Sequence, residues 1–256
     1  MTRLATQRRR NPARSARGFT FVEIMIAMAL GLFLIGGLLT LVQAMRRTST
    51  NQSGLSQLQD NERMAMQLIT DVVQSTGYFT NPVLNTAAGQ FPAATYGPAV
   101  FTFAGQGIVG NVGAPDIITS RYQTAGTNVG DNVINCTGNA SALPASFVNQ
   151  ITVVNNYLTC TLWVNGAQQP PVSLVPGITN MTVLYGVQTG NGAATNSADT
   201  YLDAAGVNAG PYWNVVKSVQ VTLTFINPMF GQPGQTNATV NFTRTIDVMN
   251  RTGVIT

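Results

Sequence analysis

Residues 18–23 read Gly-Phe-Thr-Phe-Val-Glu, and an uncharged run from Ile24 to Val42 follows at once. The run has 19 residues. A helix of about 20 apolar residues spans a bilayer core, whereas an ordinary secretory signal has an apolar core of only about 7–15 residues. The sequence therefore predicts a membrane-length helix that carries a single carboxylate, that of Glu23, at its N-terminal end.

The residues before this helix are strongly basic. They contain no acid, and the arginines among them are Arg3, Arg8, Arg9, Arg10, Arg14 and Arg17. After the run, only Arg46 and Arg47 precede the next acid. The larger cluster of positive charge stays on the cytoplasmic side of a membrane. We therefore expect a cytoplasmic N-terminus, with the rest of the chain across the membrane.

Glu23 decides between three interpretations of this segment. A plain transmembrane anchor leaves the acid unexplained, and so does a signal peptide cut after Val42-Gln43-Ala44. A charge at membrane depth costs about 2.5–3.5 kcal/mol, more than the roughly 0.3–1 kcal/mol that an acid gains at a helix N-terminus. Cleavage between Gly18 and Phe19 accounts for Glu23, because the new amino group of Phe19 lies within one helical turn of it or meets it on a neighbouring chain.

The stretch from Arg17 to Ala27, Arg-Gly-Phe-Thr-Phe-Val-Glu-Ile-Met-Ile-Ala, resembles the class III signal of type IV pilins and of type II secretion pseudopilins. The resemblance implies that a prepilin peptidase cuts after Gly18 and methylates Phe19, and that Glu23 serves subunit assembly. Many major pilins have a proline where Thr40 stands here, so a proline kink is not expected.

Cleavage also changes the charge of the protein. The whole chain is formally +4, but six of its 13 basic residues lie in the leader. The mature chain keeps seven basic and nine acidic residues, which gives −2. Phosphate binding needs a basic patch, and none remains beyond Arg46-Arg47. The charge pattern argues against nucleic acid as a partner.

The helix is expected to continue beyond the membrane, from about Phe19 to Thr76. Apolar residues recur at helical spacing after residue 50, and polar residues occupy the other positions. The apolar set is Leu55, Leu58, Ala65, Leu68, Ile69 and Val72, and the polar set is Gln57, Asp60, Arg63, Gln67, Asp71 and Gln74. Gly77 and Pro82 are stop signals. We divide the chain into a leader at 1–18, a helix at 19–80 (19–43 in the membrane or filament core, 44–80 amphipathic) and a β-rich domain at 81–256.

The β-rich domain shows strict alternation of apolar and polar residues, which predicts antiparallel sheet with one buried face. The expected strands are 116–122, 151–154, 157–164, 178–187, 215–226 and 240–248, with a turn at Asn155-Asn156. The predicted fold class is α+β and pilin-like: a long N-terminal helix whose first half spans the membrane, packed on an antiparallel sheet with one core.

Both ends of the mature chain resemble PilW-like minor pilins. The similar stretches are 61–79, which closes on Gly-Tyr-Phe, then 184–187, 213–223 and 242–251. The region from Asn81 to Gln150 matches poorly. The resemblance implies a minor pilin that acts in the assembly, priming or tip of a type IV pilus, in motility or adhesion. The alternatives are a pseudopilin of a type II secretion system and a membrane-anchored adhesin or DNA-uptake component.

The residues needed for catalysis are missing. The chain has no His and a single Lys, Lys217. Ser-His-Asp and Cys-His sites are therefore excluded, and two Cys without His argue against zinc. Gly105-Gln106-Gly107-Ile108-Val109-Gly110 matches a nucleotide-binding pattern, but no helical pattern follows it. We expect no enzyme activity and no cofactor.

Two further pairs of residues are candidate sites. Cys136 and Cys160 are expected to form a disulfide in an oxidising compartment, worth about 3 kcal/mol, although two buried thiols are the alternative. Asp199 and Asp203 lie in a loop with Asn191 and Asn196 that offers oxygen ligands for calcium. The spacing fits no EF-hand, so a solvated loop is favoured.

The resemblance also implies partners and a location. The partners are the prepilin peptidase, other minor and major pilins, the inner-membrane assembly platform and, before assembly, membrane lipid. The expected location is the inner membrane of a bacterium, with the C-terminal domain in the periplasm, and afterwards the pilus.

Overall fold

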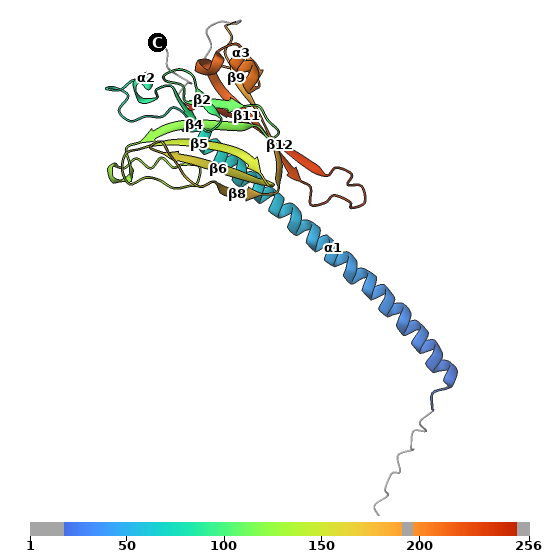
Figure 1. Cartoon of the computed structure of the whole chain (residues 1–256). Helices are drawn as coiled ribbons and strands as arrows, with labels where there is room; N and C mark the ends of the chain where they lie inside the picture. The colour runs from blue at the N-terminus through green and yellow to red at the C-terminus, as the bar shows by residue number, and fades with distance from the viewer. Residues whose placement is uncertain (1–17, 191–196, 250–256) are drawn as a thin grey trace, which may run out of the picture. The chain divides into compact units, whose positions relative to one another are not determined.

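The structure is a computed structural model that describes residues 18–190 and 197–249 (Figure 1). The leader residues 1–17, the loop residues 191–196 and residues 250–256 lie outside the described residues, so the predictions for the leader arginines, Asn191, Asn196 and the end of the PilW-like stretch cannot be placed. The chain divides into two compact units, residues 1–50 and 51–256.

The secondary structure begins with one long helix and continues mainly as strands. Its elements are α1 (Phe21–Gln74), α2 (Ala87–Gln90), β1 (Ala94–Tyr96), β2 (Ala99–Phe101), β3 (Ile108–Asn111), β4 (Ile117–Thr124), η1 (Thr127–Val129), β5 (Ala145–Val154), β6 (Tyr157–Val164), β7 (Ala167–Gln168), β8 (Val172–Pro176), β9 (Ile178–Val187), β10 (Thr200–Leu202), α3 (Ala204–Ala209), η2 (Tyr212–Val215), β11 (Val216–Ile226) and β12 (Thr239–Asp247). An apolar helix followed by antiparallel strands is the predicted fold class.

The described residues of the second unit form three sheets rather than the single sheet expected. One has the order β3-β4-β5-β6-β7, with β8 also paired to β6; another has the order β10-β9-β11-β12; and β1 pairs with β2. All their strand pairs are antiparallel. The two larger sheets adjoin at β9, where the amide of Asp116 donates to Met181 O at 2.9 Å. The alternation of apolar and polar residues shows which face of a strand is buried, but it does not show which strands pair with each other. The sequence therefore could not predict how the strands divide into sheets.

The second half of α1 supplies the helical part of the core. Ala65, Met66, Ile69 and Val73 are fully buried there. The helix lies against the six-stranded sheet, since Ser120 Oγ of β4 donates to Val72 O at 3.3 Å. Leu55 was predicted on the buried face but is 44% exposed. It lies one turn before Leu58, the first buried residue of the helix, so the packed face begins later than the apolar pattern does.

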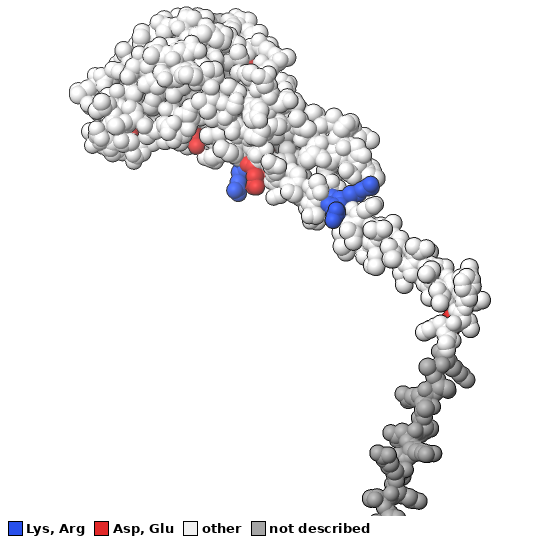
Figure 2. Space-filling model, turned by 60° about the horizontal axis from the view of Figure 1, so that its bottom comes forward, with Lys and Arg blue, Asp and Glu red and all other residues white. Residues whose placement is uncertain are grey.

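The strands predicted from alternation bury the residues that share a face. In β11, Val219, Val221, Leu223 and Phe225 are buried, while the residues between them are more exposed. The β5–β6 hairpin turns at Asn155 and Asn156, whose φ angles of 52° and 64° fit a two-residue hairpin turn. Few of the side chains are charged, and Figure 2 shows a face on which Lys, Arg, Asp and Glu are sparse.

Candidate assembly site

The start of α1 is closed by a reciprocal cap between Thr20 and Glu23. The Glu23 carboxylate accepts from Thr20 N and from Thr20 Oγ1, both at 3.4 Å, while Glu23 N donates to Thr20 Oγ1 at 3.3 Å. This is a capping box, which satisfies backbone donors that have no partner inside the helix. From the sequence, only the weaker interaction of Glu23 with the helix dipole was considered as a local role, and the cap was not predicted, although Thr-x-x-Glu is its sequence signature.

The cap positions the acid beside the predicted cleavage point. Gly18 and Phe19 precede the helix and are exposed, Phe19 by 81%. The Glu23 carboxylate is held near the amide of Thr20, and Thr20 directly follows Phe19. Removal of residues 1–18 would leave an ammonium group on Phe19. A peptidase and a neighbouring subunit both need access to this stretch, and the structure leaves it open.

The helix that follows exposes apolar side chains on all its faces up to Val42. Phe33 is 80% exposed, Leu32 71% and Ile35 55%, although residues of this kind are usually buried. By length and composition the helix can cross a membrane, and none of its most apolar window is buried in the structure. A helix that is apolar all round needs lipid or other helices as its surroundings.

A disulfide joins Cys136 and Cys160, whose Cα atoms are 6.1 Å apart. Cys160 lies in β6, and Cys136 lies in the long connection between β4 and β5. Both are buried, and the Cys136 amide donates to Asn149 Oδ1 at 2.8 Å. The bond therefore fixes a connection without regular strands to the centre of the six-stranded sheet.

The two aspartates considered for calcium have separate structural partners. The Asp199 carboxylate accepts from the Thr189 amide at 3.0 Å, and this hydrogen bond lowers the pKa of Asp199. Asp203 is the N-cap of α3 and accepts from Gly206 N at 2.7 Å. Within residues 18–190 and 197–249, no three acidic, His or Cys side chains gather into a possible metal site.

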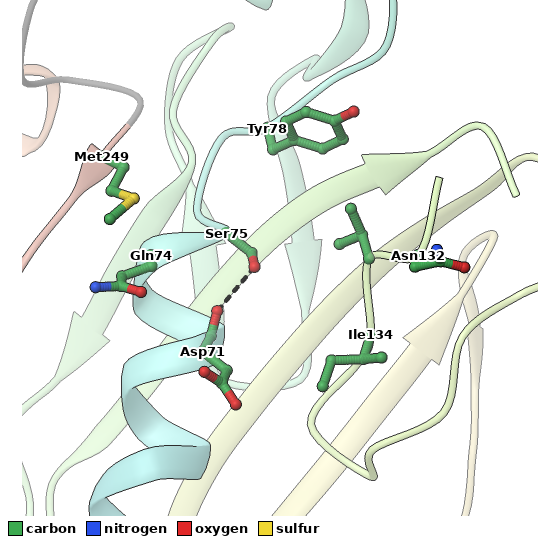
Figure 3. A pocket seen from close by; sticks show the side chains of 8 residues that line it. Asp71, Gln74, Ser75, Tyr78, Asn132, Ile134 and Met249 are labelled. Atoms are coloured by element: carbon green, nitrogen blue, oxygen red, sulfur yellow. Dashed lines mark hydrogen bonds between the residues drawn. The ribbon is translucent and has the colours of Figure 1, made fainter. Parts of the chain in front are cut away.

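An open pocket of about 660 Å³ lies at the end of α1. Figure 3 shows Asp71, Gln74 and Ser75 on the helix, Tyr78 after it, and Met249 on the other side from Asn132 and Ile134. Burial and the neighbouring Asp131 raise the pKa of Tyr78. The walls combine apolar groups with one carboxylate, so the pocket lacks the paired acid and base that hydrolytic chemistry needs.

Arg121 of β4 is a buried cation that sequence reasoning missed. Its guanidinium donates to Gln106 O and Pro92 O at 2.6 Å and to Phe91 O at 3.1 Å. It also lies over the ring of Phe101, 4.2 Å from the centroid. Burial lowers the pKa of Arg121 to about 10. Its hydrogen-bond partners are backbone carbonyls, which no sequence pattern can indicate. These hydrogen bonds attach the 91–106 connection to the six-stranded sheet.

Asp116 joins the two larger sheets from a buried position. Its carboxylate accepts from Gly113 N and Val183 N, both at 2.8 Å. Its carbonyl accepts from Thr152 Oγ1 at 3.1 Å. Asp116 was expected to begin a strand, whereas β4 begins at Ile117. Its role is structural.

Two family models match the chain. The model described as type IV pilus-assembly protein W matches residues 145–251, and the prokaryotic N-terminal methylation motif matches residues 13–39. The second match spans Gly18, Phe19, Glu23 and most of the exposed apolar helix. The two matches together indicate a minor pilin of the PilW type that carries an N-terminal methylation motif.

The comparison of structures finds similarity to a type IV-like pilin from Thermus thermophilus. The identity is 10% and the TM-score 0.42, over 77% of this chain and 97% of that one. A search of curated proteins gives no match.

The PilW and methylation matches are those of a pilin, a non-enzymatic structural protein of the type IV pilus. The methylation motif implies processing by a prepilin peptidase and assembly with other pilins. A prepilin with an apolar N-terminal helix is consistent with residence in the inner membrane and then in the pilus. The PilW match covers β5 to β12, so the family signal lies in the sheets as well as in the N-terminal motif.

Proposed function

We propose that this PilW-family pilin acts in the priming or tip complex of a type IV pilus, and that Glu23 provides the charge that docks it there. Before assembly its N-terminus is cytoplasmic, the first half of α1 lies in lipid, and the sheets lie in the periplasm with the second half of α1. The observation that carries the proposal is the capped carboxylate of Glu23 next to the exposed Gly18-Phe19 bond, at the start of an apolar helix.

Docking follows from the electrostatics of that end of the helix. In lipid, the hydrogen bonds from Thr20 lower the cost of keeping Glu23 charged, but they leave its charge uncompensated. The ammonium group of a neighbouring subunit's first residue supplies the opposite charge. Two unit charges 4 Å apart attract by about 4 kcal/mol at an effective dielectric constant of 20. This attraction selects the axial position at which one helix stops beside another.

Assembly also requires surroundings for the exposed apolar helix. Extraction from lipid into water would expose the side chains of Phe33, Leu32 and their neighbours, at about 25 cal/mol per Å² of apolar area. A bundle of similar helices avoids this cost. The inner-membrane assembly platform is the partner expected to receive the helix from lipid, and the disulfide between Cys136 and Cys160 suits a domain on the oxidising side of the membrane.

The test is to replace Glu23 by Gln. Gln can complete a capping box as Glu does, but it is neutral, so the variant removes the charge and keeps the cap. The matched control is Asp60→Asn, which neutralises an exposed acid further along the same helix. Measurements are the mass of the mature N-terminus and the amount of the chain in sheared pili.

We expect Glu23→Gln to be cut after Gly18 and methylated on Phe19, but to be depleted from pili at least tenfold, while Asp60→Asn behaves like the wild type. A tenfold loss corresponds to about 1.4 kcal/mol, a minor part of the attraction worked out above. Normal incorporation of Glu23→Gln would refute the role of the charge. Loss of enzyme secretion with intact pili in a deletion strain would instead indicate a secretion pseudopilin.

A further inference from the structure

β12 forms one margin of the four-stranded sheet and pairs only with β11 among the described residues (Figure 1). It has nine residues, whereas the opposite margin, β10, has three. The strands at the margins of the six-stranded sheet, β3, β7 and β8, have four, two and five residues. β12 is therefore the longest open strand in the described part of the chain.

The register shows which backbone groups of β12 face outward. At one end of the ladder the amide of Val248 donates to Lys217 O, and at the other the amide of Asn227 donates to Ala238 O. Hydrogen-bonded pairs alternate along an antiparallel ladder. The even-numbered residues of β12 thus pair with β11, and the outward groups belong to Thr239, Asn241, Thr243, Thr245 and Asp247. Each of these five residues is exposed.

Natural proteins protect such strands, and β12 lacks most of the usual devices. Proline, lysine, bulges and short length all prevent pairing at a sheet edge. β12 contains no proline or lysine, and its register with β11 runs without a shift. Its charges are those of Arg244 and Asp247. Threonine, valine and isoleucine make up more than half of it, and these residues favour strands.

The core side of β12 is incompletely covered. Its row of inward residues lies beside a fully buried row on β11, in which Leu223 is 0% exposed and Phe225 1%. On β12, Phe242 packs against Phe225 with 5.7 Å between the ring centroids, yet Phe242 and Val240 remain half-buried. Arg244 occupies the next place in this row and is exposed.

We propose that the outer edge of β12 binds an extended segment of a different pilin subunit, which adds a strand to the four-stranded sheet. The segment would place apolar side chains beside Val240 and Phe242 and a carboxylate beside Arg244. A second copy of β12 fits less well, because its own inward row (Val240, Phe242, Arg244 and Ile246) has no acid for Arg244. The inference rests on the proposed function in one respect, that the chain assembles with other pilins.

The first experiment maps the neighbour of β12 in living cells. A photo-crosslinking amino acid replaces Asn241 in the full-length chain, and a control chain carries it at Val83, an exposed loop residue. We expect an adduct from position 241 in which mass spectrometry finds a peptide of another pilin, and no such adduct from position 83. An adduct with a second copy of this chain, or none from a correctly processed chain, would overturn the proposal.

The second experiment removes the outward amides. Thr243→Pro with Thr245→Pro deletes two N–H groups that do not pair with β11, and proline is tolerated at a sheet edge. The control, Thr243→Val with Thr245→Val, loses the same side-chain hydroxyls, which contact Thr222 and Gln220, but keeps both amides.

We expect the proline pair to lower the yield of the adduct about thirtyfold relative to the valine pair, from two lost backbone hydrogen bonds. Equal yields would overturn the proposal. If the proline pair is degraded, the crosslink from position 241 decides the question by itself. A failure of the proposed function would be recognised by a different result. In that case Glu23→Gln would enter pili normally, whatever the crosslinks of the β12 variants show.

Discussion

Asp116→Ala is the sharpest test of how the two larger sheets hold together. The substitution removes the acceptors of Gly113 N and Val183 N, and leaves the buried amide of Val183 without its partner. Loss of a hydrogen bond to a charged group costs about 1.5–3 kcal/mol at a buried amide and less at a half-buried one. Part of this cost is offset, because the variant no longer has to bury a carboxylate. We expect the free energy of unfolding to fall by about 3 kcal/mol.

The two tryptophans report on the two sheets separately. Trp163 lies in β6 of the six-stranded sheet, and Trp213 packs against Tyr185 of β9, with 4.8 Å between the ring centroids. Thermal unfolding of the full chain in detergent, followed by fluorescence of Trp163→Phe and Trp213→Phe backgrounds, therefore observes each sheet alone. Three kcal/mol corresponds to a decrease in Tm of roughly 6–12 °C for a domain of this size. Both probes should shift together, because Asp116 bonds to both sheets.

Thr152→Val is the control, since it removes only the hydroxyl that donates to Asp116 O. Its expected cost is about 0.5–1.5 kcal/mol. If Asp116→Ala lowers Tm no more than Thr152→Val does, the carboxylate does not couple the sheets. If only one tryptophan reports a shift, the sheets unfold independently.

Three other substitutions test the core of the second unit. Replacing Cys136 and Cys160 together by Ser should lower the free energy of unfolding by about 3 kcal/mol, as reduction of the wild type should, measured by urea titration; an unchanged midpoint would contradict a stabilising disulfide. Gly110→Ala should cost about 1–3 kcal/mol, because its new Cβ would overlap the hydroxyl of Tyr185. That hydroxyl has no hydrogen-bond partner among the described residues, but the ring carbons of Tyr185 would also lie 2.6 and 2.9 Å from the new Cβ. Adding Tyr185→Phe should therefore recover part of the lost stability, and adding Tyr185→Leu should recover more; no recovery in either double variant would refute the clash. Arg121→Lys should cost about 2–3 kcal/mol in the same titration despite keeping the charge, because a lysine cannot span three carbonyls; a neutral result would mean that charge alone matters there.

Strands that alternate between apolar and polar residues could be predicted from the sequence, and so could β6, whereas the first part of β5 could not. β9 has the predicted bounds, and β11 begins one residue after the prediction, because solvent on one side imposes strict alternation. β5 begins at Ala145, six residues before its predicted start. The part that was not predicted, residues 145–150, contains Asn149 and Gln150, which are buried and hydrogen-bonded. Polar residues of this kind hide a strand until their partners are known.

The sequence also indicates those features of the site that depend on neighbouring residues, and not those that depend on residues far apart in the chain. The start of α1, Glu23 and the membrane-length run are local properties of the chain, so the sequence indicates them directly. Arg121 and Asp116 act through backbone groups that lie far away in the sequence, such as the carbonyl of Phe91 and the amide of Val183. Backbone partners leave no residue signature, and only the fold shows that these two charges are satisfied.

The cap on Glu23 bears on why an acid, rather than an amide, stands at the start of the helix. A glutamine would satisfy Thr20 as well and would cost less in lipid, so capping alone favours Gln at this position. The charge is therefore a liability in the membrane that only a cationic partner can offset. In the proposed function, cleavage before Phe19 would create such a cation on every processed subunit, one residue from the cap. The charge of Glu23 therefore accounts both for the cost of keeping the isolated helix in lipid and for the gain on docking. Both effects favour movement of the helix out of the membrane and into the filament.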